Sequence, residues 1–200
     1  MDLRVIAVAT LAVVLSGCST VRQGHYFDPE VIESFSVGEA TREQVGRALG
    51  APVQEQVRVN DFGRFETLTY HYAEQDAFSG QFRQFRNLEL EFLDGTLNAY
   101  MLMATTQEAG WGEPVTGFTT LERRVDTRES TRERLGRPDA VGRYPTSLAI
   151  FEGAEFDEVW VYFDIDQRGS SLEIAKFMLG FDRRGLLQSK GKVVTRRNAP

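Results

Sequence analysis

The chain contains one twelve-residue pattern twice, as TREQVGRALGAP at residues 41–52 and as TRESTRERLGRP at residues 127–138. The two copies agree at six of their twelve positions without a gap, and they lie 86 residues apart. Thr41 is typical of a helix N-cap, and either Asp126 or Thr127 could cap the second helix. In both copies the glycine followed by a proline is typical of a helix end. In the first copy, Gln44 at the third helical position completes a capping box. The pattern therefore predicts two short helices that begin and end in the same way.

Strand patterns accompany the first copy. Apolar residues alternate in LTYHY (68–72) and LELEF (88–92), as they do in strands with one buried face. Asp94-Gly95 is typical of a tight hairpin, after which TLNAYMLM (96–103) predicts a returning strand. Upstream, DPEVIESF (28–35) predicts another short helix with proline at its first position. The first copy thus belongs to a unit of two helices followed by an antiparallel meander.

Similar strands follow the second copy. The stretch EVWVYFDID (158–166) corresponds to LTYHY, so that Trp160 is expected in the place of Tyr70. The stretch FMLGFDRRGLL corresponds to LEFLDGTLN, so that Phe181 is expected in the place of Phe92. The order of helix, strand and turn is therefore the same in both halves.

These repeats predict an α+β protein of two tandem modules, each a helix–helix pair packed on a small antiparallel β-meander. A unit of roughly 80 residues buries only about 60% of its surface by itself, so we expect the modules to pack side by side. The expected boundaries are 28–103 for the first module, 104–117 for a linker, 118–190 for the second module and 191–200 for a basic tail.

The N-terminus predicts export and lipidation. The apolar run from Val5 to Leu15 is shorter than the roughly 20 residues that a membrane span needs, and it suits the h-region of a signal peptide. The next residues, up to Cys18, match the lipobox of bacterial lipoproteins. An ordinary signal peptide with a chance cysteine is the alternative, but Cys18 is the single cysteine of the chain and stands where the lipobox requires it. We therefore expect residues 1–17 to be a lipoprotein signal peptide and Cys18 to be the lipidation site.

Resemblance to bacterial lipoproteins implies the location of the mature protein. An acylated Cys18 would anchor the chain, and Ser19 in the next position implies sorting to the outer membrane. Residues 18–27 would form a tether that holds the folded part near the bilayer, on the periplasmic face. Since no second cysteine exists, no disulfide can form within the chain.

The charge of the chain argues against nucleic-acid binding. It has 29 acidic and 23 basic residues, a net charge of −6, so phosphates would be repelled. The basic residues are uneven, because the last eleven positions (190–200) hold four of them and no acidic residue. Such a tail could contact anionic lipid headgroups, or it could be a frayed, solubilising terminus.

No catalytic motif is present in the sequence. His25 and His71 are the only histidines, and no HExxH motif or Cys/His cluster could hold a metal. Neither a phosphate-binding loop nor a GxSxG nucleophile motif occurs. We therefore expect a protein that is not an enzyme, with no metal, no cofactor and no small-molecule substrate.

One stretch has the composition of a protein interface. QFRQFRN (81–87) interleaves two aromatic residues, Phe82 and Phe85, with two basic ones, Arg83 and Arg86. Arginine and aromatic side chains are enriched in protein–protein interfaces. These four residues are the predicted partner-binding site. The alternative is that this is the start of a strand whose phenylalanines fill the space between sheet and helices.

The repeated unit resembles a known family. The pattern T-x-x-[QE]-V-x-x-x-[LF]-G-x-P, followed by an aromatic strand and an F-x-x-G hairpin, is similar to the SmpA/OmlA domain of the BamE component of the outer-membrane β-barrel assembly machinery. Two such units in tandem also resemble the β-lactamase inhibitor protein, which is built from a duplicated helix–helix–sheet module. The matching residues are Thr41, Gln44, Val45, Leu49, Gly50 and Pro52 in the first copy, and Thr127, Leu135, Gly136 and Pro138 in the second. The chain departs from the assembly component by carrying two units.

These resemblances imply a function. The chain would be a lipid-anchored outer-membrane lipoprotein that acts as a non-enzymatic binding or scaffold protein in envelope or β-barrel assembly. Its partners would be the membrane, through Cys18, and envelope proteins such as the β-barrel assembly machinery. The alternative is an inhibitor or sensor protein that binds a periplasmic enzyme.

Overall fold

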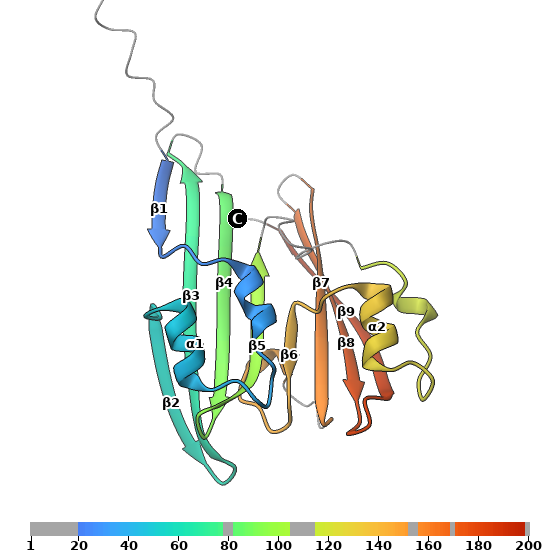
Figure 1. Cartoon of the computed structure of the whole chain (residues 1–200). Coiled ribbons are helices and arrows are strands. Elements are labelled where there is room, and N and C mark those ends of the chain that lie inside the picture. Colours follow the sequence, from blue (N-terminus) through green and yellow to red (C-terminus); the bar gives the residue numbers. More distant parts are fainter. Residues whose placement is uncertain (1–19, 78–81, 105–114, 152–155, 169–170, 199–200) are drawn as a thin grey trace, which may run out of the picture.

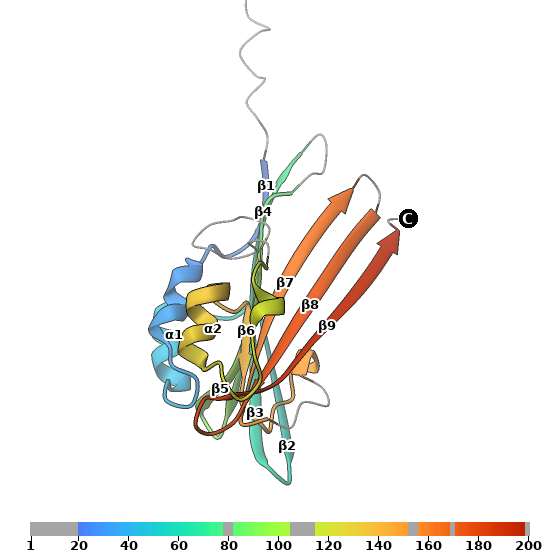
Figure 2. The same cartoon turned by 90° about the vertical axis from the view of Figure 1, so that its right-hand side faces the viewer.

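The computed structural model describes residues 20–77, 82–104, 115–151, 156–168 and 171–198. These residues form one nine-stranded antiparallel sheet, and the two short α-helices both lie on the same face of it (Figures 1 and 2). No helix among them is both long enough and apolar enough to cross a membrane. The predicted signal peptide and Cys18 lie outside the described residues.

The two halves of the chain contain the same order of elements. The first half comprises β1 (Thr20–Gly24), the 3-10 helix η1 (Pro29–Ser34), α1 (Arg42–Leu49), β2 (Gln54–Asn60), β3 (Gly63–Asp76), β4 (Phe82–Leu93) and β5 (Thr96–Ala104). The second half comprises the 3-10 helix η3 (Phe118–Thr120), α2 (Arg128–Leu135), β6 (Ala140–Gly142), the 3-10 helix η4 (Ala149–Phe151), β7 (Glu158–Arg168), β8 (Ser171–Phe181) and β9 (Leu187–Asn198). Apart from β1 and η4, each element has a counterpart in the other half.

The two halves share a single sheet. In each half the α-helix is followed by a four-stranded meander, β2-β3-β4-β5 or β6-β7-β8-β9. Strand β5 pairs with β6 at three positions, Ala99 with Gly142, Tyr100 with Val141 and Met101 with Ala140. The chain is therefore α+β in the broad sense and mostly β, and the expectation of a separate meander in each module is wrong. The repeat pattern could not predict this, because pairing between outer strands depends on their position in space.

The repeated twelve-residue pattern has the same role in both halves. The side chain of Thr41 accepts a hydrogen bond from the Gln44 N–H, and that of Thr127 accepts one from the Ser130 N–H, each at 3.2 Å. Both threonines complete capping boxes, the second with the Ser130 hydroxyl in place of the glutamine amide. The predicted cap of the first helix is thus confirmed, and the second helix has an equivalent that the glutamine-based pattern could not predict.

The helix ends correspond as well. Gly50 and Gly136 terminate α1 and α2 with φ values of 75° and 76°, in the region that favours glycine. The Gly50 carbonyl accepts a hydrogen bond from the hydroxyl of Tyr70 at 3.1 Å, and the Gly136 carbonyl accepts one from Tyr162 at 3.2 Å. Burial raises the pKa of both tyrosines, which keeps their hydroxyls protonated as donors.

The strand register corrects one predicted correspondence. Phe92 pairs with Leu97 and Phe181 pairs with Leu187, each directly after a β-bulge, so the predicted equivalence of the two phenylalanines is confirmed. Tyr162, rather than Trp160, stands in the place of Tyr70. The prediction was two residues out of register because the connection between β6 and β7 is longer than that between β2 and β3.

The predicted helix–helix pairs are not present among the described residues. The segment predicted as the first helix, residues 28–35, forms the 3-10 helix η1, with Asp28 as its cap. Its hydrogen bonds join residues three positions apart, as a 3-10 helix requires. For example, the Phe35 N–H donates to the Ile32 carbonyl at 3.1 Å. Its counterpart η3 has only three residues. Each half thus has one α-helix that covers the sheet.

The predicted tether and the predicted basic tail both contain strand residues. Thr20–Gly24, within the predicted tether 18–27, form β1 and pair with the outer edge of β3. Strand β9 continues through the predicted basic tail as far as Asn198, paired with β8. Most of the predicted linker lies outside the described residues.

The helix-side face of the sheet carries the main core, to which both halves contribute. Its fully buried members include Val45, Leu68, Leu90, Phe92, Leu179, Phe181 and Leu187. A second cluster covers part of the opposite face, where the connection between β6 and β7 folds over the sheet. Glu91, fully buried on that face, accepts hydrogen bonds from the Asn98 amide at 3.1 Å and the Ser147 N–H at 2.7 Å. One carboxylate thus fastens the connection to the sheet.

Replacing either capping threonine with alanine should destabilise the protein by about 1 kcal/mol, because one N-cap hydrogen bond is lost. Both helices rest on the same sheet, so Thr41→Ala and Thr127→Ala should each shift one cooperative urea unfolding transition. The matched control is Thr119→Ala, at an exposed position, with an unchanged midpoint expected. Two separate transitions in either variant would contradict the single-sheet architecture.

Candidate functional site

The predicted partner-binding residues do not form one surface. They lie on β4, where alternation directs Phe85 to the face opposite the helices, and a register shift at Gln84 interrupts the alternation before Arg83. Arg83 is exposed and pairs with Asp76, with 3.1 Å between nitrogen and oxygen. Phe85 is half-buried, and its ring packs edge-on against His71 at a centroid distance of 5.4 Å. The side chain of Phe82 lies outside what the structure describes.

Arg86 points to the helix side and is fully buried. Its Nη1 donates a hydrogen bond to the Phe27 carbonyl at 2.7 Å, and its guanidinium lies 4.6 Å from the centre of the Tyr26 ring. This contact holds the segment after β1 against the sheet. Arg86 thus has a structural role and does not share a surface with its neighbour Phe85, because two-residue alternation directs the two side chains to opposite faces.

An exposed aromatic pair lies at the tip of the β2–β3 hairpin. The side chains of Phe62 and Tyr144 are 56% and 49% exposed, and their ring centroids are 5.9 Å apart in an edge-to-face arrangement. The exposed Asp61 precedes Phe62 in the turn. Large exposed aromatic residues in contact are a typical signal of a binding surface. We call Asp61, Phe62 and Tyr144 the tip surface.

Hydrogen bonds hold the tip surface in place. The Asn60 side chain accepts from the Phe62 N–H at 2.9 Å, and the Asp94 side chain accepts from the Arg64 N–H at 2.9 Å. Asp94 lies in the β4–β5 turn, so the two neighbouring hairpins are joined. No pattern in the sequence predicted this site. Its signal was an aromatic residue inside the turn Asn-Asp-Phe-Gly, but Tyr144 is 82 residues away and only the folded chain brings it there.

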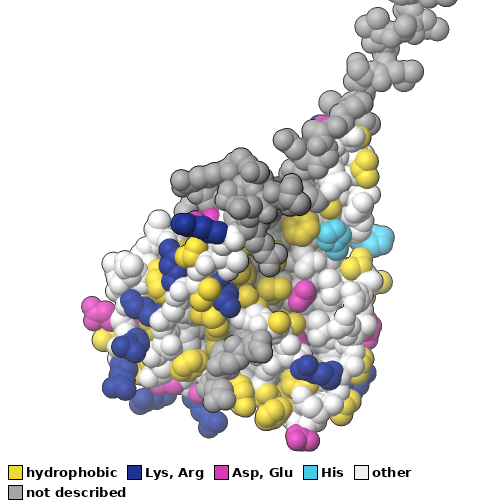
Figure 3. Space-filling model, turned by 180° about the vertical axis from the view of Figure 1, so that it is seen from behind, with side chains coloured by type: hydrophobic (Ala, Val, Ile, Leu, Met, Phe, Trp, Pro, Cys, Tyr) yellow, Lys and Arg dark blue, Asp and Glu magenta, His cyan; other side chains and the backbone are white. Residues whose placement is uncertain are grey.

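The tip surface lies at the opposite end of the molecule from the start of β1. In Figure 1 the chain enters β1 at the top, and the β2–β3 turn projects at the bottom. The fourteen residues of β3 connect the two ends, a length of about 45 Å. The face opposite the helices, seen in Figure 3, shows hydrophobic side chains over its middle and Lys and Arg toward one flank.

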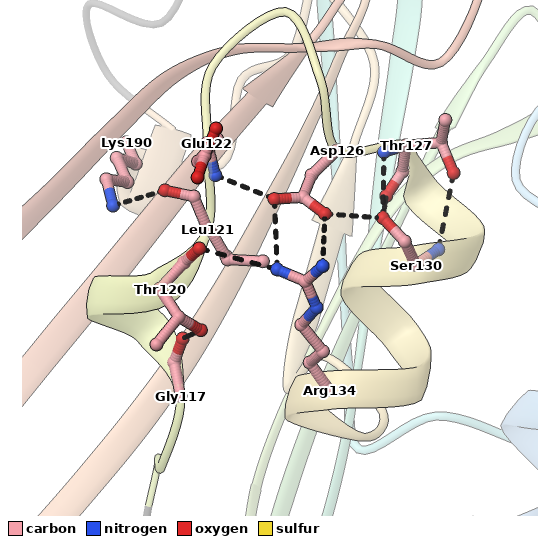
Figure 4. Close-up of polar contacts among 9 residues, drawn as sticks. All are labelled: Gly117, Thr120, Leu121, Glu122, Asp126, Thr127, Ser130, Arg134 and Lys190. Atoms are coloured by element: carbon pink, nitrogen blue, oxygen red, sulfur yellow. Dashed lines mark hydrogen bonds and ion pairs between the residues drawn. The ribbon is translucent and has the colours of Figure 1, made fainter.

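A second candidate, the buried carboxylate of Asp126, proves to be structural (Figure 4). Asp126 is 3% exposed and accepts hydrogen bonds from the Glu122 N–H at 2.6 Å and the Ser130 hydroxyl at 2.8 Å. Both terminal nitrogens of Arg134 approach it, at 3.1 and 3.2 Å. This network fixes α2 to the segment before it. Both carboxylate oxygens of Asp126 are engaged by residues of the fold, so this carboxylate is not available to react with a substrate.

The network also lowers the pKa of Asp126. Burial opposes the charge, but the hydrogen bonds from Glu122 and Ser130 and the charges of Arg134 and Lys190 together favour the ionised form. In the first half the equivalent position is Ala40, whose backbone makes the same two hydrogen bonds, Ala40 N–H to the Ser36 carbonyl and Leu97 N–H to the Ala40 carbonyl. The ionised network is therefore a feature of the second half alone among the described residues.

No metal site is found in the described part of the chain, where no three His, Cys, Asp or Glu side chains lie close enough together to share an ion. The two histidines are adjacent through the backbone, since the His25 N–H donates to the His71 carbonyl at 3.1 Å.

Comparisons with known proteins give little further information. No family model matches the sequence and no curated protein matches it, so the resemblance to the SmpA/OmlA domain has no support from them. Among solved structures, the chain is similar to a putative beta-lactamase inhibitor protein from Streptococcus mutans. The TM-score is 0.43 and the sequence identity 14%, over 77% of this chain and 82% of the other. A likeness at this level carries no conclusion about function.

The Asp126 network makes stability depend on pH. Because the pKa of Asp126 is lowered in the folded state, its contribution is present above the unfolded pKa of about 4 and is lost as the pH falls through the folded pKa. Asp126→Asn should lower the free energy of unfolding by about 1–3 kcal/mol at pH 7. The difference from wild type should shrink in urea titrations below pH 4. Glu133→Gln, at an exposed position of α2, is the control. A difference that stays constant down to pH 2.5 would contradict this assignment.

Proposed function

We propose that the protein is a lipid-anchored, non-enzymatic binding protein on the periplasmic face of the outer membrane, and that it binds a protein partner through the tip surface. The observation that carries the proposal is the contact between Phe62 and Tyr144, two aromatic rings that remain about half exposed in the folded chain. Aromatic side chains of this kind supply much of the binding energy in protein interfaces. Their fixed position lowers the entropy that binding costs.

The position of the tip surface supports this proposal. The lipobox cysteine is two residues before β1, so an acyl anchor would hold the upper end of the sheet at the bilayer. The tip surface would then point away from the membrane, toward the periplasm. A projecting hairpin with an acidic residue beside an aromatic pair is complementary to a concave surface, such as the substrate cleft of an enzyme. This favours an inhibitor or sensor that binds a periplasmic enzyme.

The short distance between anchor and sheet supports a second candidate. From Cys18 to Thr20 the chain reaches at most about 7 Å, which would hold the outer edge of the sheet close to the bilayer. A protein held in this way could also serve as a scaffold for outer-membrane proteins, including the β-barrel assembly machinery. The two candidates differ in the partner that contacts the tip surface.

Crosslinking from the tip surface tests both candidates. A photoreactive phenylalanine analogue at position 62 of the full-length lipoprotein, in native envelopes, should crosslink to a periplasmic enzyme, whose activity the purified protein should then lower stoichiometrically. Recovery of an assembly component instead would support the scaffold. Phe62→Ala with Tyr144→Ala should reduce capture from a remote crosslinking position by tenfold or more. Val125→Ala, which removes a 65% exposed side chain elsewhere, should not. Equal capture by the double variant would contradict the proposal.

The anchor is tested separately. Cys18→Ser should move the protein from the outer-membrane fraction to the soluble periplasmic fraction, because the acyl acceptor is lost. Its urea unfolding midpoint should not change, since β1 begins after the cysteine. Retention in the membrane fraction would show that Cys18 is not the attachment point.

A further inference from the structure

A pocket of about 240 Å³ lies where the two halves meet on the helix side of the sheet. The first half contributes Ile32 and Glu33 of η1, the residues 35–37 that follow η1, and Tyr100 of β5. The second half contributes Arg132 of α2 and Trp160 of β7. In the sheet beneath this place, the short β5–β6 pairing joins the halves. The residue that α2 contributes to the pocket is Arg132, so apolar side chains of this helix do not fill the space between the two halves.

One wall of the pocket is aromatic and well fixed. Trp160 and Tyr100 are 7% and 8% exposed, and the Trp160 ring packs against Phe181 at a centroid distance of 5.0 Å. The Tyr100 hydroxyl is directed to the Pro138 carbonyl at 3.4 Å. Two fixed rings with a small exposed fraction form a preorganised apolar surface, as small-molecule sites require.

The charges around the pocket leave one cation available. Glu33 forms an ion pair with Arg137. Glu158 accepts a hydrogen bond from the Trp160 indole N–H at 2.6 Å and lies 3.3 Å from Arg128.

The side chain of Arg132 is exposed and forms no hydrogen bond or ion pair with the described residues. Both acidic side chains of the lining are thus engaged, and Arg132 is the charged group that a ligand would meet.

We infer that this pocket binds a small organic anion with one aromatic or similarly compact apolar group. The anionic group would pair with Arg132, and the apolar group would pack against Trp160 and Tyr100. A cavity of about 150 Å³ holds benzene, so about 240 Å³ suits one ring with a short acidic side chain. The inference does not depend on the proposed function, because the pocket and the tip surface lie on different parts of the molecule.

Phenylacetate and its neutral analogue phenylacetamide are the probes. The chain has two tryptophans, so Trp111→Phe leaves Trp160 as the single indole reporter in the full-length protein. Phenylacetate should change the Trp160 fluorescence saturably, and phenylacetamide should bind at least tenfold more weakly. Phenylacetate should also raise the melting temperature of the chain that retains Trp111, because it binds the folded state.

Arg132→Gln separates the charge from the cavity. This variant should lose about tenfold in affinity for phenylacetate and should bind phenylacetamide unchanged. Arg47→Gln, an exposed arginine of α1 outside the pocket, is the matched control and should bind both probes as the parent does. The inference is overturned if phenylacetate gives no saturable change, if the two probes bind equally, or if Arg132→Gln retains full affinity.

Discussion

The pairing of β5 with β6 is the contact on which the rest of the molecule depends. Three residue pairs join the halves and turn two four-stranded meanders into one sheet. The small residues Ala99 and Ala140 are fully buried there, which lets the β6–β7 connection pack on the face opposite the helices. On the other face the same pairing brings the chain after η1 close to α2. Both the shared core and the pocket between the halves follow from it.

The two halves attach their helices to this sheet by different chemistry. In the first half the buried helical residue is Val45, a purely apolar contact, whereas Thr131 is fully buried in the same place in the second half. The ionised network of Asp126, Ser130 and Arg134 adds the attachment that the thinner apolar face of α2 lacks. Hydrogen bonds to a buried charge are strong only when its partners are fixed, and here the capping box fixes Ser130. The same backbone arrangement therefore holds one helix by an apolar contact and the other by a polar network.

The placement of the candidate binding residues follows the alternation of strands. Arg86 and Phe85 are neighbours in sequence, but one is buried beside Tyr26 and the other faces the opposite side of the sheet. A composition typical of interfaces therefore does not make a surface when it lies along one strand. The tip surface consists of residues from two separate turns, and the pocket consists of residues from both halves. In each case the side chains that could bind a partner or ligand come from separate segments of the chain, which only the fold brings together.

The sequence by itself determined the local structure. The repeated threonines, glycines and prolines predicted both helices and the cap of the first, and the alternating apolar residues predicted the meanders, because these features depend on neighbours within a few residues. The equivalence of Phe92 and Phe181 was predicted in the same way. Tertiary structure alone decided the union of the two meanders, the equivalence of Tyr162 with Tyr70, the burial of Arg86 and the contact between Phe62 and Tyr144. Each of these depends on which distant strands and turns meet, and that is set by how both halves bury their apolar surface together.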